Sequence, residues 1–455
     1  MIAALATAAV LVALFILTVG VARHGVRATL LSPLTLVAVL LIGHAAVRPL
    51  VLSSDPEAAV LGVWRLGWSE NALAEAGWIL VVGFGLFGVA FALALRRPAP
   101  VTADRAVSGA RCLAAAAIGC VLWGALFLRL GGPQALIEDP ASLKTGQFGG
   151  AYGLAGLAAC TAATLLAFDG WLREQKRRML AVAAICGATA LLGSICLATR
   201  GPILVTLLGG LLLLGWRRRL RVRQAVVVGL ALVVAVVGAQ VLRQVREYAQ
   251  FGTVQEAVST TLRTDPLALL SADLIEYDHL VALVQLVPDP LARLDGESVA
   301  AVPKAFVPRA LWADKPRPID YELSEVLYGP STLAGTPFTL PGELWWNFGW
   351  LGVVLGCPLL GFVFGSAWWR WSGSEGVRAV AVAVAGAYGY LLLTRPLAAM
   401  TLTTIIGVGT VLLIAARSRA ETALTRVAAS PRRPGRALAG PVARKLAPPA
   451  DPLEK

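Results

Sequence analysis

Charged residues are scarce in this chain of 455 residues, since Asp, Glu, Lys and Arg together make up 15% of it and hydrophobic residues make up 57%. The charges that are present fall in clusters between apolar runs of roughly 17 to 25 residues, the length that a helix needs to cross a bilayer core. This pattern excludes an ordinary soluble globular protein. It predicts an all-α polytopic membrane protein.

The sequence also lacks the signs of a cleaved leader, of a disulfide framework and of a metal site. No short apolar segment is followed by a small-residue cleavage site, so the first apolar run is expected to remain as a membrane span. All six cysteines lie inside apolar runs, where we expect them to be small buried hydrophobes. The Glu-x-x-His pair of di-metal bundles occurs at Glu276 and His279 without a second copy. The sequence therefore predicts no metal and no cofactor.

About eleven apolar runs are predicted to be transmembrane helices. Every second connection between them is rich in arginine, as the positive-inside rule expects of short cytoplasmic loops. This alternation predicts an N-terminus outside and a C-terminus in the cytoplasm. It also explains the net charge of +13 without a nucleic-acid partner, because these arginines lie at helix ends beside anionic lipid. The predicted spans are 2–22, 28–48, 74–95, 112–130, 149–168, 180–198, 202–216, 225–242, 343–366, 379–394 and 397–416.

The span pattern divides the chain into four parts. Transmembrane helices 1 to 8 occupy 1–242, an outer loop (periplasmic or extracellular) occupies 243–342, helices 9 to 11 occupy 343–416, and a disordered cytoplasmic tail occupies 417–455. The outer loop is predicted to be partly helical, because Asp265-Pro266 starts an amphipathic pattern that continues to Pro288. Prolines from position 303 to 341 exclude long helices between there and the ninth span.

Four residues are candidates for acid-base chemistry at the outer face. Asp273, Glu276 and His279 recur at i, i+3 spacing on the polar side of the predicted loop helix. They form either a carboxylate and imidazole cluster that faces a cavity, or a solvated face of a helix that lies on the membrane domain. Glu343 lies just inside the ninth span, where it is either a helix-start carboxylate or a proton carrier. His44, inside the second span, is expected to take no part.

Two isolated arginines are expected in very short turns on the same outer side. Arg200 lies in Thr199-Arg200-Gly201-Pro202, and Arg395 lies in Thr394-Arg395-Pro396. A guanidinium at this depth is costly unless it is paired or bound to an anion, although it could also snorkel and cap a helical hairpin. Arginine binds phosphate oxygens with two parallel donors. Further basic residues of the outer loop are Arg243, Arg246, Arg263, Arg309 and Lys315.

Aromatic residues accompany these basic groups in the second half of the outer loop. Aromatic rings suit sugars and also membrane interfaces. For the pair Trp345-Trp346, at the start of the ninth span, we expect anchoring at the membrane interface.

Three motifs carry a resemblance to a known family. They are the turn Thr199-Arg200-Gly201, the stretch PRALWADKP from Pro308 to Pro316, and GELWWNFGWLG from Gly342 to Gly352. Together with the large outer loop they resemble the Wzy-type oligosaccharide repeat-unit polymerases, the O-antigen polymerase family. The related O-antigen ligases have a similar plan. The resemblance implies a GT-C-like, lipid-dependent, metal-independent glycosyltransferase in the bacterial cytoplasmic (inner) membrane.

The resemblance also implies the substrates, which would be oligosaccharides linked through diphosphate to a polyprenyl lipid. A hydroxyl of one repeat unit would attack the anomeric carbon of another, and polyprenyl diphosphate would leave. Arg200 and Arg395, with one or more of the other outer basic residues, would bind the diphosphate. Asp273, Glu276, His279 or Glu343 would supply the base. Expected partners are membrane lipids and the flippase and chain-length regulator of the same pathway.

Two other functions fit the same sequence. An O-antigen ligase would transfer lipid-linked glycan to a different acceptor, and His279 in the outer loop favours it because the ligases have a histidine there. A polytopic transporter or flippase would form no glycosidic bond, and it would be expected to show internal repeats, which are not apparent in this sequence.

The first prediction concerns Arg200. Arg200→Lys keeps the positive charge and loses the forked donors, so we expect it to abolish polymer formation while the protein still inserts into the membrane. Polymer length on a gel and the amount of membrane-inserted protein are the two measurements. Normal chain growth in this variant would remove Arg200 from the mechanism.

Overall fold

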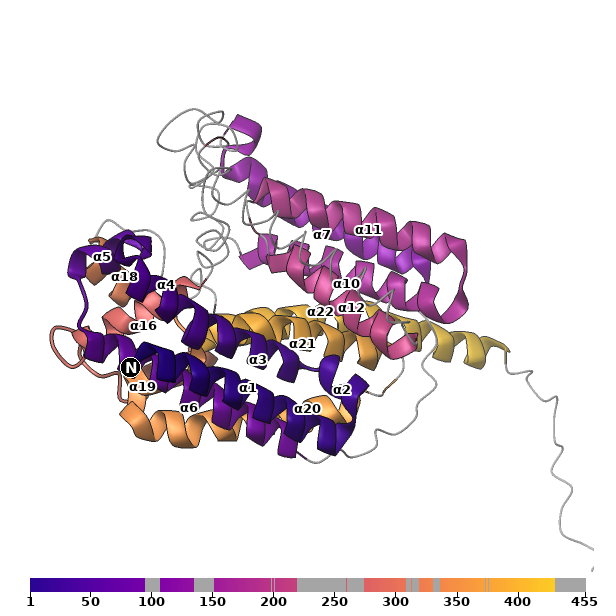
Figure 1. The fold of residues 1–455 in the computed structure, drawn as a ribbon. Coiled ribbons are helices and arrows are strands. Elements are labelled where there is room, and N and C mark those ends of the chain that lie inside the picture. Colours follow the sequence, from indigo (N-terminus) through magenta and orange to yellow (C-terminus); the bar gives the residue numbers. More distant parts are fainter. Residues whose placement is uncertain are drawn as a thin grey trace, which may run out of the picture. The chain divides into compact units, whose positions relative to one another are not determined.

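The structure, a computed structural model, describes residues 1–94, 107–134, 151–197, 199, 201–218, 259, 274–307, 312, 319–329, 336–372, 374 and 376–429. All regular elements in these ranges are helices (Figure 1). Seven helical segments among them are long and apolar enough to cross a membrane, and three shorter helices are apolar as well. The predicted class, an all-α multi-pass membrane protein, is confirmed.

Ten of the eleven predicted spans overlap with helices, and the eighth, at 225–242, lies outside the described residues. All six cysteines are free thiols, four of them buried and two half-buried. The helices that cover predicted spans are α1 (Ile2–His24), α3 (Pro33–Ile42), α6 (Glu70–Leu93), α7 (Gly109–Arg129), α10 (Ala151–Glu174), α11 (Arg177–Cys196), α12 (Gly201–Arg217), α19 (Leu340–Leu351), α20 (Cys357–Trp371), α21 (Val377–Thr394) and α22 (Leu397–Ala429). The shorter helices are α2 (Val26–Leu30), α4 (Arg48–Ser54), α5 (Leu61–Leu66), α16 (Ile275–Leu286), α17 (Glu297–Ala305) and α18 (Asp320–Tyr328), and η2 (Pro56–Ala58) is a single turn.

The second span lies later in the chain than predicted. The Ser32 side chain accepts a hydrogen bond from the main-chain N–H of Leu34 at 3.2 Å, and Pro33 takes the first helical position, so α3 begins there. A π-helical turn, η1 (Gly43–Val47), then joins α3 to α4 without a break. The apolar segment therefore covers Pro33–Ser54 rather than 28–48. His44, already expected inside this span, stays within it, and Arg48 lies in its interior rather than at its end.

The ninth span is not one straight helix. Thr339 caps its start by accepting a hydrogen bond from the Gly342 N–H at 3.2 Å. Gly349 has φ 61° and ψ −150°, a conformation that glycine adopts easily, and a π-helical turn, η4 (Gly352–Gly356), follows before α20. The expectation that Trp345 and Trp346 anchor the span at the membrane interface is wrong, because both indoles are buried in the protein core.

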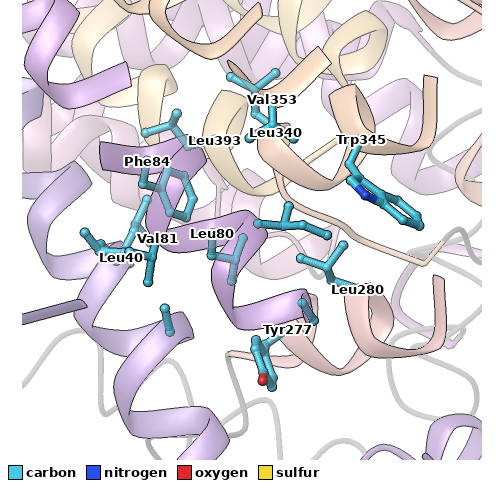
Figure 2. Packing of buried hydrophobic residues seen from close by; sticks show 14 of the residues in the cluster. Leu40, Leu80, Val81, Phe84, Tyr277, Leu280, Leu340, Trp345, Val353 and Leu393 are labelled. Carbon is cyan, nitrogen blue, oxygen red and sulfur yellow. The ribbon is translucent and has the colours of Figure 1, made fainter. Parts of the chain in front are cut away.

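One hydrophobic core surrounds α6. It packs α1, α3 and α20 against α6, and it includes buried side chains of α16 and α19 (Figure 2). Glycine permits the closest of these contacts: a Cβ at Gly361 of α20 would lie 2.2 Å from the carbonyl oxygen of Phe87 in α6. This close backbone approach is typical of helix pairs in membranes.

A second core lies among the helices of the middle of the chain. It combines buried side chains of α7, α10, α11, α12 and α21. Gly119 of α7 and Gly156 of α10 face each other there, since a Cβ on either would lie within 2.6 Å of the other's carbonyl oxygen. Figure 1 shows α7, α10 and α11 running side by side.

The sequence assigns each helix end to the cytoplasmic or to the outer side of the membrane. In the structure, ends assigned to the same side contact each other. At the predicted cytoplasmic side, Arg27 donates to the carbonyl of Arg218, and the Trp369 indole donates to the carbonyl of Phe91. At the predicted outer side, Tyr277 donates to the carbonyl of Leu73. This arrangement is what an alternating topology requires. Which side faces the cytoplasm stays a prediction from the arginine pattern.

The last helix is longer than the predicted span. α22 continues to Ala429, beyond position 416, where the tail was predicted to begin. Residues 417–429 contain Ala, Arg, Glu and Leu and no Gly or Pro, so nothing in the local sequence ends the helix before Pro431.

Candidate functional site

Helix α16 lies within the predicted outer-loop helix, begins at Ile275, and is buried along most of its length rather than solvated. It ends at Leu286, close to the predicted end before Pro288. Four consecutive residues, Glu276 to His279, are each at most 4% exposed. Tyr277 contributes to the core and donates its hydroxyl hydrogen to the carbonyl oxygen of Leu73. The solvated-face interpretation of Glu276 and His279 is therefore wrong.

The charge of Asp278 is neutralised by Arg48, a residue that lies 230 positions earlier. Arg48 donates from Nε to Oδ1 at 2.8 Å and from Nη2 to Oδ2 at 2.6 Å, a bidentate pair. Arg48 also donates to the Ala58 carbonyl at 2.8 Å, and the Val60 N–H donates to Asp278 at 3.0 Å. Both side chains are at most 2% exposed. This ion pair joins α16 to the second span and to the segment that follows it.

Glu276 lies between two basic groups. Its Oε2 is 3.3 Å from Nε2 of His44, and its Oε1 is 3.8 Å from Nη1 of Arg395. The π-helical turn η1 carries His44, whose Nδ1 donates to the Leu40 carbonyl at 3.0 Å. The other ring nitrogen, Nε2, faces the Glu276 carboxylate. His44, expected to take no part, therefore belongs to this site.

The electrostatics of Glu276 favour its ionised form. Burial by itself would raise the pKa of this carboxyl, but the hydrogen bond with His44 and the charges of Arg395 and His44 outweigh burial and lower the pKa to about 2. Glu276 is thus a carboxylate at neutral pH. A group that holds its proton so weakly is a poor general base.

Both ring nitrogens of His279 have partners. Nδ1 donates to the carbonyl of Pro337 at 2.7 Å, and Nε2 lies 3.3 Å from the hydroxyl of Tyr328. Burial lowers the pKa of His279 in spite of the nearby charge of Asp278, so the neutral ring is favoured. In that form Nε2 accepts the hydrogen bond from Tyr328. These two hydrogen bonds hold the ring of His279, which belongs to α16, against Pro337 and against Tyr328 at the end of α18.

Glu343 links the starts of two helices. It lies in the first turns of α19, and its Oε2 accepts a hydrogen bond from the Leu397 N–H, the first residue of α22, at 2.7 Å. A carboxylate at a helix start is favoured by the helix dipole. Its Oε1 is buried and has no hydrogen-bond partner among the residues that the structure describes. A role at a helix start therefore explains Oε2 of Glu343, which binds the first N–H of α22, but it does not explain the buried Oε1.

Asp320, the first residue of α18, is a carboxyl that sequence reasoning missed. Its main-chain carbonyl accepts hydrogen bonds from the N–H and the hydroxyl of Thr336, both at 3.0 Å. The next residue, Pro337, binds His279, so Asp320 and His279 are held by two consecutive residues. Burial raises the pKa of Asp320 to about 6, although the charge of Arg395 opposes the shift. Its Oδ1 is buried without a hydrogen-bond partner in the described ranges.

Four of the eleven predicted site residues fall in the described ranges, and these four lie in one region. Arg395, in the turn between α21 and α22, pairs with Glu276 and acts on the pKa of His279, and Glu343 binds Leu397, two residues after Arg395. We call Glu276, His279, Asp320, Glu343 and Arg395 the Arg395 cluster. The other predicted residues lie outside the described residues: Asp273, Arg200, Arg243, Arg246, Arg263, Arg309 and Lys315.

The Arg395 cluster combines groups of different chemistry from α16, α18, α19 and the turn between α21 and α22. Arg395 is 32% exposed, and its one ion pair to a described residue is at 3.8 Å, longer than the 2.7 to 2.9 Å typical of a charge-assisted hydrogen bond. It can therefore bind a further anion. Asp320 can accept a proton near neutral pH, whereas Glu276 stays ionised. The cluster could thus bind an anionic leaving group and remove a proton.

Arg48 is expected to be essential for stability. Arg48→Met leaves Asp278 buried without its cation, and losing one partner of a buried ion pair costs about 3–5 kcal/mol. We expect a clearly lower thermal unfolding midpoint in detergent. The double variant Arg48→Met/Asp278→Leu, which removes both charges, should recover part of that loss. Arg65→Met, an exposed arginine in α5, is the control and should change stability by no more than about 0.5 kcal/mol. Equal midpoints for Arg48→Met and Arg65→Met would contradict the role of the pair.

Comparisons of this chain with protein-family models, with curated proteins and with solved structures give no match. The resemblance to the Wzy-type polymerases therefore stays an expectation from the sequence motifs, and the function has to be argued from the chemistry of the site.

Proposed function

We propose that this chain is a metal-independent glycosyltransferase that polymerises polyprenyl-diphosphate-linked oligosaccharide repeat units into a bacterial surface polysaccharide. It would have a GT-C-like architecture and act at the outer face of the cytoplasmic membrane. The observation that carries the proposal is Arg395, a partly exposed guanidinium in a turn between two apolar helices, beside a carboxyl with a raised pKa. The proposal is also supported by the motifs at residues 199–201, 308–316 and 342–352, which resemble those of the Wzy-type polymerases.

Arg395 would stabilise the leaving group. As the bond between the anomeric carbon and the diphosphate oxygen breaks, its electron pair stays on polyprenyl diphosphate. A fixed cation in a low-dielectric site stabilises this developing charge more strongly than water does. Arg200 and the basic residues of the outer loop would add further donors.

Asp320 would act as the general base. The acceptor hydroxyl gives its proton to the Asp320 carboxylate while its oxygen forms the new bond to the anomeric carbon. The alternatives within the cluster fit less well, because Glu276 is a weak base, His279 uses both nitrogens, and Glu343 holds the start of α22. The pKa of about 6 matches what a base needs near neutral pH.

Reconstitution of the purified chain in liposomes with synthetic lipid-linked repeat units alone tests the function. A polymerase gives a ladder of products and releases polyprenyl diphosphate. We expect Arg395→Lys to lower the initial rate by about 10²-fold, the scale for losing one well-placed donor to a developing anion. The lysine keeps the charge beside Glu276, so folding should be retained.

Arg378→Lys is the matched control, because Arg378 lies near the other end of the same helix, α21. It should leave the rate unchanged. If products form only after a second acceptor is added, the chain is a ligase. Uptake of the substrate into the liposomes without new glycosidic bonds would indicate a transporter.

If Asp320 is the general base, the rate of polymerisation should depend on pH. Because Asp320 must be ionised to accept a proton, the rate should fall as the pH is lowered through about 6 and level off above about 7. Asp320→Asn should lower the rate by about 10²–10⁴-fold and remove that limb of the profile. Glu322→Gln, an exposed carboxyl on the same helix, is the control. An unchanged acid limb in Asp320→Asn would exclude Asp320 as the base.

A further inference from the structure

A cavity of about 420 Å³ lies at the opposite ends of the helices, where the arginine pattern predicts the cytoplasmic side. Three spans end around it: α1 contributes His24, α12 contributes Trp216 and Arg217, and α20 contributes Trp368 and Trp369. Arg27, from the short helix α2, completes the basic lining. Among the residues that the structure describes, none that lines the cavity is acidic.

Arg27 is fixed in place but keeps donors for a ligand. Its Nη2 donates to the carbonyls of Gly215 and Arg218 at the end of α12, where the helix dipole favours a cation. Both of these hydrogen bonds use the same nitrogen. Within the described ranges, Nε and Nη1 have no other partner, and the residue is exposed. The guanidinium is therefore oriented before any ligand arrives.

Arg217 has a buried nitrogen that no described residue satisfies. Its Nε donates to Oδ1 of Asp169 at 2.9 Å, which orients the guanidinium. Its Nη2 is buried without a hydrogen-bond partner among the described residues. Unsatisfied buried donors are rare in proteins, and a bound ligand is one way to satisfy them. Two guanidinium groups thus offer donors at one cavity, an arrangement that suits the oxygens of a phosphate.

Indole rings form part of the remaining wall. The Trp369 ring stacks on His24 with centroids 3.7 Å apart and 16° between the planes, and its N–H donates to the carbonyl of Phe91 at 2.9 Å. Trp216 and Trp368 pack against each other at 5.4 Å. Trp368 and Trp369 are at most 5% exposed, so they form a fixed wall of the cavity rather than exposed interface anchors.

Apolar side chains are also exposed near the same ends of α1, α6 and α20. Val21 near the end of α1, Leu93 at the end of α6 and Trp371 at the end of α20 are each at least 36% exposed. A soluble anion would leave such side chains uncovered, whereas acyl chains would cover them. The combination of phosphate-binding donors, indoles and exposed apolar side chains fits a lipid better than a soluble phosphate.

We propose that this cavity binds the headgroup of an anionic phospholipid of that leaflet, with its phosphate between Arg27 and Arg217. Basic pockets between transmembrane helices recognise such headgroups. The inference depends on the cavity alone and not on the proposed glycosyltransferase activity.

Native mass spectrometry of the purified full-length chain tests this site by titration with dioleoyl phosphatidylglycerol. Each basic residue near an anionic headgroup contributes roughly a fivefold factor in affinity. We expect Arg27→Gln to weaken binding of the first lipid by about that factor, and Arg27→Gln/Arg217→Gln to weaken it by about 25-fold. Glutamine at position 27 can still donate to the carbonyls at the end of α12.

Arg23→Gln is the matched control, because Arg23 is an exposed arginine of the last turn of α1 that does not line the cavity. It should change the affinity by less than about twofold. Equal effects of Arg23→Gln and Arg27→Gln would show a diffuse surface attraction and overturn the site. Should Arg217→Gln fail to fold, the comparison of Arg27→Gln with Arg23→Gln decides.

Two further titrations define the ligand. Dioleoyl phosphatidylcholine should bind at least about tenfold more weakly than phosphatidylglycerol if the charge is recognised. Inorganic phosphate should not displace bound phosphatidylglycerol at millimolar concentration. Equal binding of both lipids, or displacement by phosphate alone, would overturn the proposal.

Discussion

The burial of charge on α16 is the constraint on which the rest of the site depends. Unpaired ions are costly inside a protein that is itself surrounded by lipid, so Asp278 and Glu276 require cations from other spans. Arg48 meets Asp278 with two hydrogen bonds, and His44 and Arg395 meet Glu276. These pairs hold the outer segment to the second span and to the turn after α21. His279 of the same helix then meets the Pro337 carbonyl, next to Thr336, which binds the Asp320 carbonyl.

The sequence predicted the helices well because bilayer thickness imposes a length and apolarity that can be read locally. Arg395 was noticeable as an isolated arginine in a short turn between apolar runs, and Glu276 by its i, i+3 spacing on the polar side of an amphipathic pattern. The structure brings the two together, and their roles stay predictions. The sequence missed the pairing of Arg48 with Asp278, because the partners are separated by 230 positions and neither has a distinctive neighbour. The one available signal was an arginine within the apolar segment that ends at Ser54. Asp320 had no signal, since its raised pKa comes from tertiary burial.

The pKa values of two carboxyls in the Arg395 cluster are shifted in opposite directions. Glu276 is held ionised by His44 and Arg395, whereas burial keeps a proton on Asp320 up to a pH of about 6. Enzymes commonly separate the roles of nearby carboxyls in this way, with one as a fixed charge and the other as a proton carrier. Glu276 would then hold Arg395 in place while leaving it able to bind a second anion.

The hydrogen bond from the Leu397 N–H to Glu343 has a mechanical consequence. The turn that bears Arg395 is attached through Glu343 to α19, which is in turn attached to the outer segment by the Trp346 indole and the Ala292 carbonyl at 2.9 Å. A ligand that pulls on this guanidinium therefore acts against two helices and the outer segment together. The turn would behave as a stiff receptor whose geometry is set before binding, so little ordering entropy would be lost when an anion arrives.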